Sequence, residues 1–201
     1  MIEVIKFGGS LCQPDALTAA IAWMARQAQS HSIVVVCGGG AYADTIRSEQ
    51  KRLALDDVVA HRQALLAMEQ TALLVQRAWY QKTGVELPLS ESGDPMTLWS
   101  PRGLLFDHQE VPASWDITSD SLSVWLAHKI QAQQLSLMKN LDLGLETGSP
   151  KEWQAKGWVD HAFCDLALNA RYPIGLVGRR LWGQAIGAVE GRTHLSDSTG
   201  I

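Results

Sequence analysis

Two similar stretches near the start of the chain decide the fold: residues 2–10 read IEVIKFGGS, and residues 32–40 read SIVVVCGGG. Each is a short apolar run that ends in glycines, which is typical of a strand followed by a tight turn. The second run is continuous and rich in β-branched residues, which favours a strand covered on both faces, as in a parallel sheet. The sequence therefore predicts strands at 2–7 and 32–37.

Helical periodicity alternates with strand-like runs along the rest of the chain. We expect helices at 14–29, 41–52, 57–82, 118–131, 151–156 and 180–188, and further strands at 85–89, 103–106, 135–138 and 174–177. The segment between the strands at 85–89 and 103–106 is predicted to be loop, as are residues 144–150. This alternation favours an α/β layered fold with a largely parallel sheet. Neither a low-complexity linker nor an internal repeat divides the chain, so we expect one domain over residues 1–201.

Composition excludes several classes of protein. The 201 residues carry a formal charge of −4, which argues against a general nucleic-acid binder. Cys12, Cys37 and Cys164 are far apart and odd in number, which favours a reducing, cytoplasmic compartment. No apolar run has the length of a membrane span, and the N-terminus does not have the pattern of a signal peptide.

The glycines after the first two strands predict an anion site. In a parallel sheet both turns open at the carboxyl edge, where glycine lets a ligand approach backbone N–H groups and a helix N-terminus favours negative charge. The alternative is that each turn only links a strand to a helix, but Lys6 beside the first turn favours a phosphate site. No Walker A loop is present.

The second loop also matches a dinucleotide fingerprint, as Gly38-x-Gly40-x-x-Ala43. A Rossmann unit needs an acidic residue that closes its second strand. The acids at about the right distance, Asp56 and Asp57, precede a helix instead, which counts against NAD or FAD. A Rossmann dehydrogenase remains an alternative, and it would bind NAD(P) more tightly than ATP.

Polar residues gather at the start of the helix predicted at 118–131. Asp116 and Asp120 are four residues apart and share a face if both are helical. One interpretation is capping, in which Asp116 or Thr118 accepts hydrogen bonds from the first backbone N–H groups. Capping explains one acid more readily than two, so a functional role for the pair stays open.

Four motifs together resemble those of the amino acid kinase superfamily. The segment Lys6 to Ser10 is similar to its opening motif, and Val34 to Ala41 to its second loop. Asp116 to Asp120 is similar to its catalytic helix start, and Leu137 to Gly144 to the strand and loop that meet the nucleotide. The short chain and residues 60–70 also resemble the small archaeal and methylotroph kinases that act on 5-(aminomethyl)-3-furanmethanol phosphate.

This resemblance implies a three-layer αβα sandwich with a mainly parallel central sheet. The acceptor would bind to the half formed by residues 1–115 and the nucleotide to the half formed by residues 116–201. The implied protein is a cytoplasmic kinase that moves the γ-phosphoryl of ATP, with Mg²⁺, to a phosphate or carboxylate of a small anionic metabolite. The furan phosphate, in one-carbon cofactor biosynthesis, is one candidate acceptor, and a homo-oligomer is expected. The alternative is a nucleotide-binding regulatory or storage protein of the same fold with weak or no catalysis.

The resemblance also implies roles for individual residues. The catalytic residues would be Lys6, Asp120 and Asp116, with Lys6 on the transferring phosphoryl group and Asp120 orienting it. Residues implied in binding ATP or its phosphates are Gly8, Gly9, Ser10, Gly39, Lys139, Asp142 and Gly144; those implied in binding the acceptor are Gly38, Gly39, Gly40, His61 and Arg62. No side chain is expected to bind a metal, because Mg²⁺ would be held through the nucleotide.

One feature departs from the family pattern. Many members have a second phosphate-binding lysine late in the chain, but the matching region near residues 157–163 has none. Lys139, Arg179 and Arg180 are the alternatives for this second cation, and the sequence does not choose between them.

Overall fold

The computed structural model describes residues 1–106 and 110–183, and within them seven strands form one sheet. The strands are β1 (Ile2–Phe7), β2 (Ser32–Cys37), β3 (Leu89–Ser90), β4 (Thr97–Trp99), β5 (Gln134–Met138), β6 (Leu145–Glu146) and β7 (Ile174–Val177). Their order in the sheet is β3-β4-β2-β1-β5-β7-β6, and every neighbouring pair is parallel except β6 with β7. Both glycine turns follow central strands.

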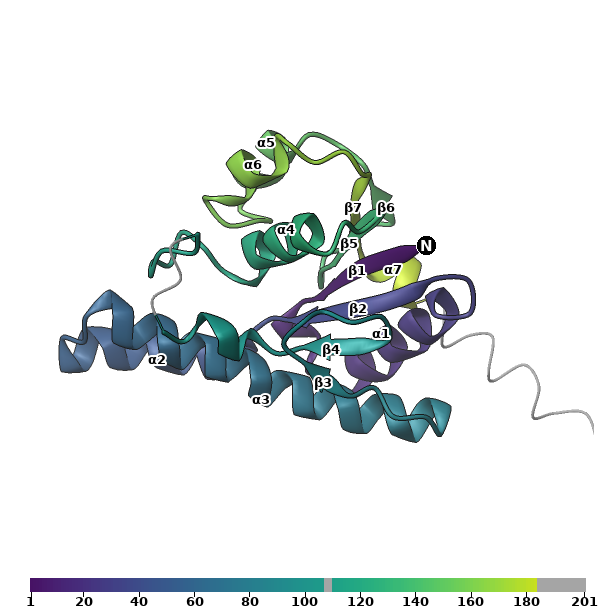
Figure 1. Cartoon of the computed structure of the whole chain (residues 1–201), viewed down its shortest axis with the longest axis horizontal. Coiled ribbons are helices and arrows are strands. Elements are labelled where there is room, and N and C mark those ends of the chain that lie inside the picture. Colours follow the sequence, from purple (N-terminus) through teal and green to yellow (C-terminus); the bar gives the residue numbers. More distant parts are fainter. Residues whose placement is uncertain (107–109, 184–201) are drawn as a thin grey trace, which may run out of the picture.

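Helices cover both faces of this sheet, which gives the three layers that the family resemblance implies (Figure 1). The α-helices are α1 (Pro14–Gln27), α2 (Gly40–Leu53), α3 (Asp57–Thr83), α4 (Ser119–Lys129), α5 (Pro150–Ala155), α6 (Phe163–Ala167) and α7 (Arg179–Trp182), and the 3₁₀ helices are η1 (Gly9–Leu11) and η2 (Pro101–Leu104). One apolar cluster packs α4, α5 and α6 against the sheet, and a second packs α1 and the later part of α3 against its other face.

Alternation along β1 decides which layer each of its side chains meets. Val4 belongs to the cluster under α4, whereas Ile5 and Phe7 belong to the cluster under α1. Lys6 is two residues after Val4, so its side chain points to the α4 face. A lysine in this strand therefore lies in the layer that carries Asp120.

The strand register aligns the ends of the three central strands. Phe7 of β1 pairs with Cys37 of β2 on one side and with Met138 of β5 on the other. The residues that follow these strands, from Gly8, Gly38 and Lys139 onward, consequently emerge side by side at the carboxyl edge.

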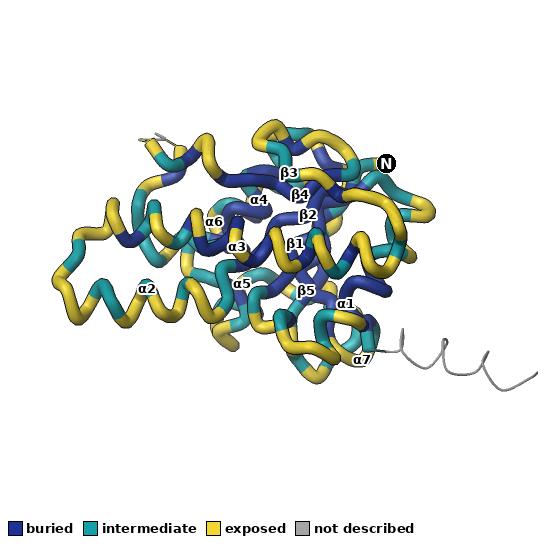
Figure 2. The backbone as a smooth tube through the Cα atoms, turned by 90° about the horizontal axis from the view of Figure 1, so that it is seen from below, coloured by how far each residue is buried: buried dark blue, intermediate teal, exposed yellow. Residues whose placement is uncertain are grey.

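The helix α2 and the start of α3 extend beyond this edge (Figure 1). None of the residues of α2 is buried, and exposed residues alternate with partly buried ones along the helix (Figure 2). In the same view, buried residues concentrate in the strands of the sheet (Figure 2). The helix α2 thus forms a rim at the carboxyl edge and does not contribute to the core.

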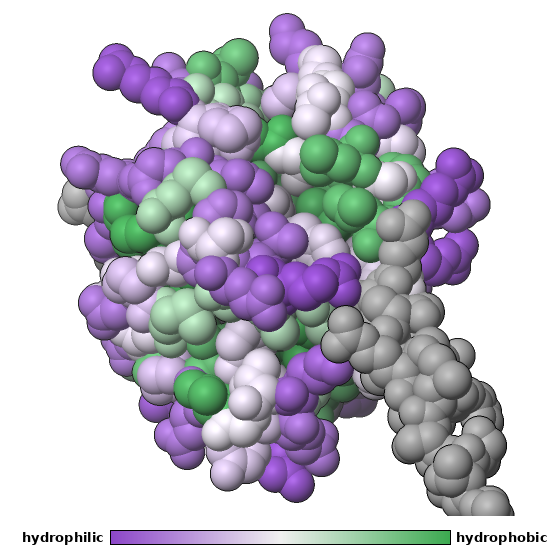
Figure 3. Space-filling model, turned by 90° about the vertical axis from the view of Figure 1, so that its right-hand side faces the viewer, coloured by the Kyte–Doolittle hydropathy of each residue, from purple (hydrophilic) through white to green (hydrophobic). Residues whose placement is uncertain are grey.

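Figure 3 shows the side toward which the N-terminus lies, where hydrophilic side chains are interrupted by small apolar groups. In the described parts of the chain, no helix combines the length and the apolar character needed to cross a bilayer.

Most predicted elements are confirmed. The strands predicted at 2–7, 32–37 and 174–177 have the same bounds in the structure, and the one at 135–138 begins one residue earlier. The helices predicted at 14–29, 41–52, 57–82, 118–131 and 151–156 are present, each with ends within two residues of the prediction. Of the helix predicted at 180–188, α7 covers the beginning, and residues 184–188 lie outside the described residues.

The short strands were predicted less well. The strand predicted at 103–106 is wrong, because Pro101 begins the 3₁₀ helix η2 there. The nearby strand is β4, three buried residues within a segment predicted to be loop, and of the strand predicted at 85–89 only Leu89 is in a strand. Residues 144–150 contain the two-residue β6, and α6 was not predicted. Elements this short have too few residues to show a periodicity.

Candidate active site

A buried carboxylate lies between two lysines at the carboxyl edge of the sheet. The Oδ1 atom of Asp120, in the first turn of α4, is 2.9 Å from Lys6 Nζ, and its Oδ2 atom accepts a hydrogen bond of 2.6 Å from Lys139 Nζ. The side chains of Lys6 and Asp120 are almost fully buried, and that of Lys139 is 15% exposed. Residues from β1, α4 and the end of β5 therefore meet in one charged cluster.

Burial and charge both act on the cluster. Burial alone would raise the pKa of the Asp120 carboxyl, but the ammonium groups of Lys6 and Lys139 outweigh it and hold that pKa below its ordinary value. Burial, followed by repulsion from Lys6, lowers the pKa of Lys139 from 10.5 to about 8, although Asp120 opposes this shift. Two cations share one anion, so an additional anion beside them would be stabilised.

The two glycine loops are in direct contact. A Cβ atom added to Gly9 would lie 2.2 Å from the backbone nitrogen of Gly40, and one added to Gly40 would lie 2.9 Å from the carbonyl oxygen of Gly9. Gly40 also has a φ of +54°, which side chains rarely adopt. Glycine is therefore needed at both positions for the loops to converge beside Lys6.

Not every amide in these loops is available to a ligand. The Gly8 N–H donates to the Met138 carbonyl, and the Gly38 N–H donates to the Phe7 carbonyl, so both extend the sheet pairing. Among the described residues, no turn or loop hydrogen bond uses the N–H of Gly9, Gly39 or Gly40. The last two lie at the N-terminus of the 14-residue helix α2. Uncommitted backbone donors are thus present in both loops.

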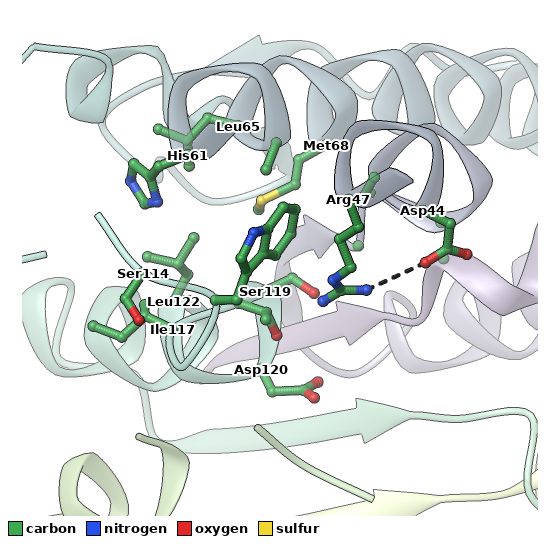
Figure 4. Close-up of a pocket in the computed structure, with 18 of the residues that line it drawn as sticks. Asp44, Arg47, His61, Leu65, Met68, Ser114, Ile117, Ser119, Asp120 and Leu122 are labelled. Carbon is green, nitrogen blue, oxygen red and sulfur yellow. Dashed lines mark hydrogen bonds and ion pairs between the residues drawn. The ribbon is translucent and has the colours of Figure 1, made fainter. Parts of the chain in front are cut away.

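A cavity of about 250 Å³ opens beside the loops and the charged cluster. Its walls come from α2 and α3 on one side, and from α4 and the segment before it on the other (Figure 4). The predicted site residues that line it are Lys6, Gly9, Ser10, Gly38, Gly39, Gly40, His61 and Asp120. The structure therefore brings together residues of the predicted phosphate and acceptor sites.

The cavity wall includes a polar and aromatic cluster. The guanidinium of Arg47 lies 4.3 Å from the centroid of the Trp115 ring. The Trp115 indole N–H donates to Gln50 Oε1 at 2.6 Å, and Gln50 Nε2 donates to Asp57 Oδ1 at 2.8 Å. The helix α2 is thereby tied to the segment that leads into α4. Leu65, Met68 and Ile117 add an apolar surface to the same cavity.

The two predicted acceptor residues on α3 differ in placement. His61 lines the cavity, and its Nε2 atom is buried without a hydrogen-bond partner in the described part of the chain. Burial lowers the pKa of His61, which favours its neutral form. Arg62 is not among the lining residues, and its guanidinium lies 5.4 Å from the centroid of the Phe106 ring.

The start of α4 differs from the expectation. Asp116 precedes the helix, is exposed and does not line the cavity, so it does not share the cluster of Asp120. The alternative interpretation, capping by Asp116 or Thr118, is not what the structure shows, because Thr118 is the N-cap residue but makes no side-chain cap. Instead, Asp160 accepts hydrogen bonds from the N–H groups of Thr118 and Ser121 and from both hydroxyls. Sequence spacing gave no signal for Asp160, which lies about forty residues away.

Three other predicted residues lie outside the charged cluster. Asp142 is exposed and pairs with Arg180 at 3.2 Å and with Arg179 at 3.9 Å. The Gly144 carbonyl accepts a hydrogen bond from the Gly178 N–H, and a Cβ atom added to Gly144 would meet no other atom within 4 Å. Since both arginines pair with Asp142 and Lys139 pairs with Asp120, Lys139 is the only one of the three alternative cations in the cluster. No group of three or more candidate metal-binding side chains exists among the described residues.

Comparisons with known proteins agree with this architecture. A model of the amino acid kinase family matches residues 1–86. The (5-(aminomethyl)furan-3-yl)methyl phosphate kinase of Methanocaldococcus jannaschii is 25% identical over 145 residues, which are 70% of this chain and 67% of that protein.

Two solved structures have the same fold. The UMP kinase of Bacillus anthracis aligns with a TM-score of 0.65 and 15% identity over 95% of this chain and 92% of its own. An aspartate kinase from Synechocystis aligns with a TM-score of 0.64 and 14% identity over 89% of this chain, but this covers only 38% of that longer protein.

Proposed function

The chain belongs to the amino acid kinase family, and from that premise we propose that it transfers the γ-phosphoryl group of ATP to a phosphate or carboxylate of a small metabolite. The observation that carries this proposal is the Lys6–Asp120–Lys139 cluster beside two touching glycine loops. It is a cationic, partly closed site built for two anionic groups.

Such a reaction must bring two anions together. Two unit charges at about 4 Å repel by about 4 kcal/mol at an effective dielectric constant of about 20. Lys6 and Lys139 oppose this repulsion, and we assign them to the transferring phosphoryl group and to the ATP phosphates, respectively. Asp120 holds both ammonium groups in place, so that their positions are set before the substrates bind.

The uncommitted amides complete the phosphate site in this proposal. The N–H groups of Gly9 and Gly39 stabilise charge that develops on the phosphoryl oxygens, in the manner of an oxyanion hole. Gly8 contributes its small size but not its N–H, which already binds the Met138 carbonyl. Ser10 lines the same cavity and adds a hydroxyl donor.

The acceptor occupies the cavity under α2 in this proposal. Arg47 supplies a cation, Trp115 supplies an aromatic face, and His61 offers a neutral ring nitrogen. A volume of about 250 Å³ suits a small molecule with a planar ring. These features support a furan phosphate acceptor like that named for the Methanocaldococcus jannaschii relative. Asp116 and Arg62 lie outside the cavity, which weakens a direct role for either residue.

We propose ATP and Mg²⁺ as the nucleotide and the metal. Bound Mg²⁺ would neutralise part of the phosphate charge. The described residues present no carboxylate cluster for it, so we propose that it is held through the nucleotide. Asp142 and Gly144 stay predicted as nucleotide contacts.

Two further properties belong to the proposal. All three cysteines are free thiols, which supports a reducing, cytoplasmic compartment. Leu66, Leu73 and Tyr80 are exposed at intervals of seven residues on α3, which supports pairing of this helix in a homo-oligomer.

The proposal is tested by incubating the protein with ATP, Mg²⁺ and (5-(aminomethyl)furan-3-yl)methyl phosphate, and following the reaction by ³¹P NMR. We expect ADP and a new diphosphate, and we expect neither with Asp120→Asn. A panel of carboxylate and phosphate metabolites extends the test to other acceptors. Nucleotide binding without turnover of any acceptor would contradict catalysis and support the regulatory alternative.

A further inference from the structure

The first turn of α4 holds the critical carboxylate but does not cap itself. The first backbone N–H groups of a helix have no partner within the helix, and a local side chain usually satisfies one of them. The N-cap residue Thr118 makes no such bond. Without another partner this turn would tend to fray, and it contains both Ser119 and Asp120.

A distant carboxylate supplies the missing acceptors. The Oδ2 atom of Asp160 accepts from the N–H of Thr118 at 2.8 Å, from its hydroxyl at 2.7 Å and from the N–H of Ser121 at 3.0 Å. The Oδ1 atom accepts from the Ser121 hydroxyl. One side chain therefore binds both residues that flank the Ser119–Asp120 pair.

The loop that carries Asp160 is itself firmly anchored. It connects α5 to α6, and the aromatic rings of Trp153 and Phe163 at its two sides are buried and lie 6.3 Å apart. Both rings belong to the apolar cluster that includes the inner face of α4. A backbone hydrogen bond of 3.0 Å from Ala162 to the carbonyl of Asp116 ties the same segments a second time. The packing and the hydrogen bond of this loop therefore hold Asp160 in a fixed position beside α4.

We propose that Asp160 is a positioning residue for phosphoryl transfer, which holds the first turn of α4 so that Asp120 stays between Lys6 and Lys139. It touches neither reacting group and does not line the cavity. Its effect on the reaction passes through Asp120, because two ammonium groups remain close together only while a carboxylate separates them.

The test compares two substitutions of Asp160 with a matched control. Asp160→Ala removes all four hydrogen bonds. Asp160→Asn keeps them, because its amide oxygen accepts from Thr118 and Ser121 while its NH₂ group donates to the Ser121 hydroxyl. Asp165→Asn removes a charge from an exposed position on α6 nearby.

Two measurements do not depend on catalysis. We expect Asp160→Ala to speed hydrogen exchange at the amides of Thr118 and Ser121. We also expect it to lower the pKa of Lys139 further, followed by ¹⁵N NMR of the lysine side chains, because a displaced Asp120 no longer stabilises the Lys139 ammonium against the charge of Lys6. Asp160→Asn and Asp165→Asn should match the wild type in both measurements.

The kinetic arm rests on the proposed function. Asp160→Ala should lower kcat by about 10²-fold, the effect of a displacement of about 1 Å, with little change in KM for ATP. Asp160→Asn should restore kcat. If the wild type turns over no acceptor, the proposed function fails, while hydrogen exchange and the Lys139 titration still decide the role of Asp160.

Two results would overturn the proposal. One is an unchanged Lys139 titration in Asp160→Ala. The other is a set of changes in Asp160→Asn as large as those in Asp160→Ala. That result would mean that the charge of Asp160 matters and that its hydrogen bonds do not. If Asp160→Ala does not fold, the double variant Thr118→Ala/Ser121→Ala removes only the two hydroxyl donors, and the same shifts in smaller size are expected. Their absence would equally contradict the proposal.

Discussion

Replacement of Lys139 by methionine should make the protein more stable and less active. The Lys139 ammonium is largely buried beside Lys6, and its pKa is lowered from 10.5 to about 8. A difference of this size corresponds to about 3 kcal/mol by which folding disfavours the charged form. Methionine has a similar length, carries no charge and leaves Asp120 paired with Lys6. We therefore expect Lys139→Met to raise the free energy of unfolding at pH 7 by up to about 3 kcal/mol.

The pH dependence of wild-type stability shows whether the charge of Lys139 stabilises or destabilises the fold. Below pH 8, Lys139 is charged in both folded and unfolded states, and the full cost of burying the charge is present. Between pH 8 and 10.5 the folded state releases its proton while the unfolded state keeps it, so this cost disappears and stability rises. Lys139→Met has no such group. The extra stability of Lys139→Met over the wild type should therefore become smaller between pH 8 and 10.5.

Urea unfolding followed by circular dichroism at pH 7 and at pH 10.5 measures both effects. Other lysines and the tyrosines titrate in both proteins, so the difference between the two proteins isolates Lys139. Lys82→Met, at an exposed position near the end of α3, is the control and should change stability little at either pH. The phosphotransfer rate of Lys139→Met should fall by about 10²- to 10³-fold if Lys139 binds phosphate. A variant less stable than the wild type at pH 7 would refute the reasoning, because its ammonium would then stabilise the fold.

Three other predictions follow from the same site. Asp120→Asn leaves two buried ammonium groups without their carboxylate, so it should lose about 3–5 kcal/mol of stability at pH 7, measured by thermal unfolding. Because the pKa of Asp120 is lowered, the wild type loses this contribution as pH falls through that lowered value, and Asp120→Asn should lack that acid transition. Gly9→Ala would place a Cβ 2.2 Å from the nitrogen of Gly40 and push the loops apart, which should lower kcat by about 10²-fold. Gly103→Ala, whose Cβ would meet its nearest neighbour at 3.6 Å, should behave as the wild type. Trp115→Leu removes the Arg47 contact and the indole hydrogen bond, and should raise the KM for the acceptor by about 10-fold while kcat stays similar.

The elements that could be predicted are those whose pattern is local. The strands at 2–7 and 32–37 are apolar runs that stop at glycine, and the periodicity of the helix at 57–82 extends over more than twenty residues. Burial on one face imposes these repeats, so they can be read without a structure. The strand Thr97–Trp99 and the helix Phe163–Ala167 are too short to carry such a repeat, and they form because they complete a sheet and a core made elsewhere.

The sequence by itself determined the α/β fold and the two glycine turns, because strand pattern and residue type act over a few neighbouring positions. The roles of Lys6 and Asp120 were implied by the family resemblance and stay predictions. Only the tertiary structure decided which side chains from distant segments contact these residues. The register that aligns Phe7 with Met138 brings Lys139 to the same edge as Lys6, and the packing of α5 and α6 brings Asp160 to the start of α4. Ion pairs and caps between distant segments depend on how strands register and layers pack. That arrangement follows from the burial of the whole core, and no short stretch of sequence contains it.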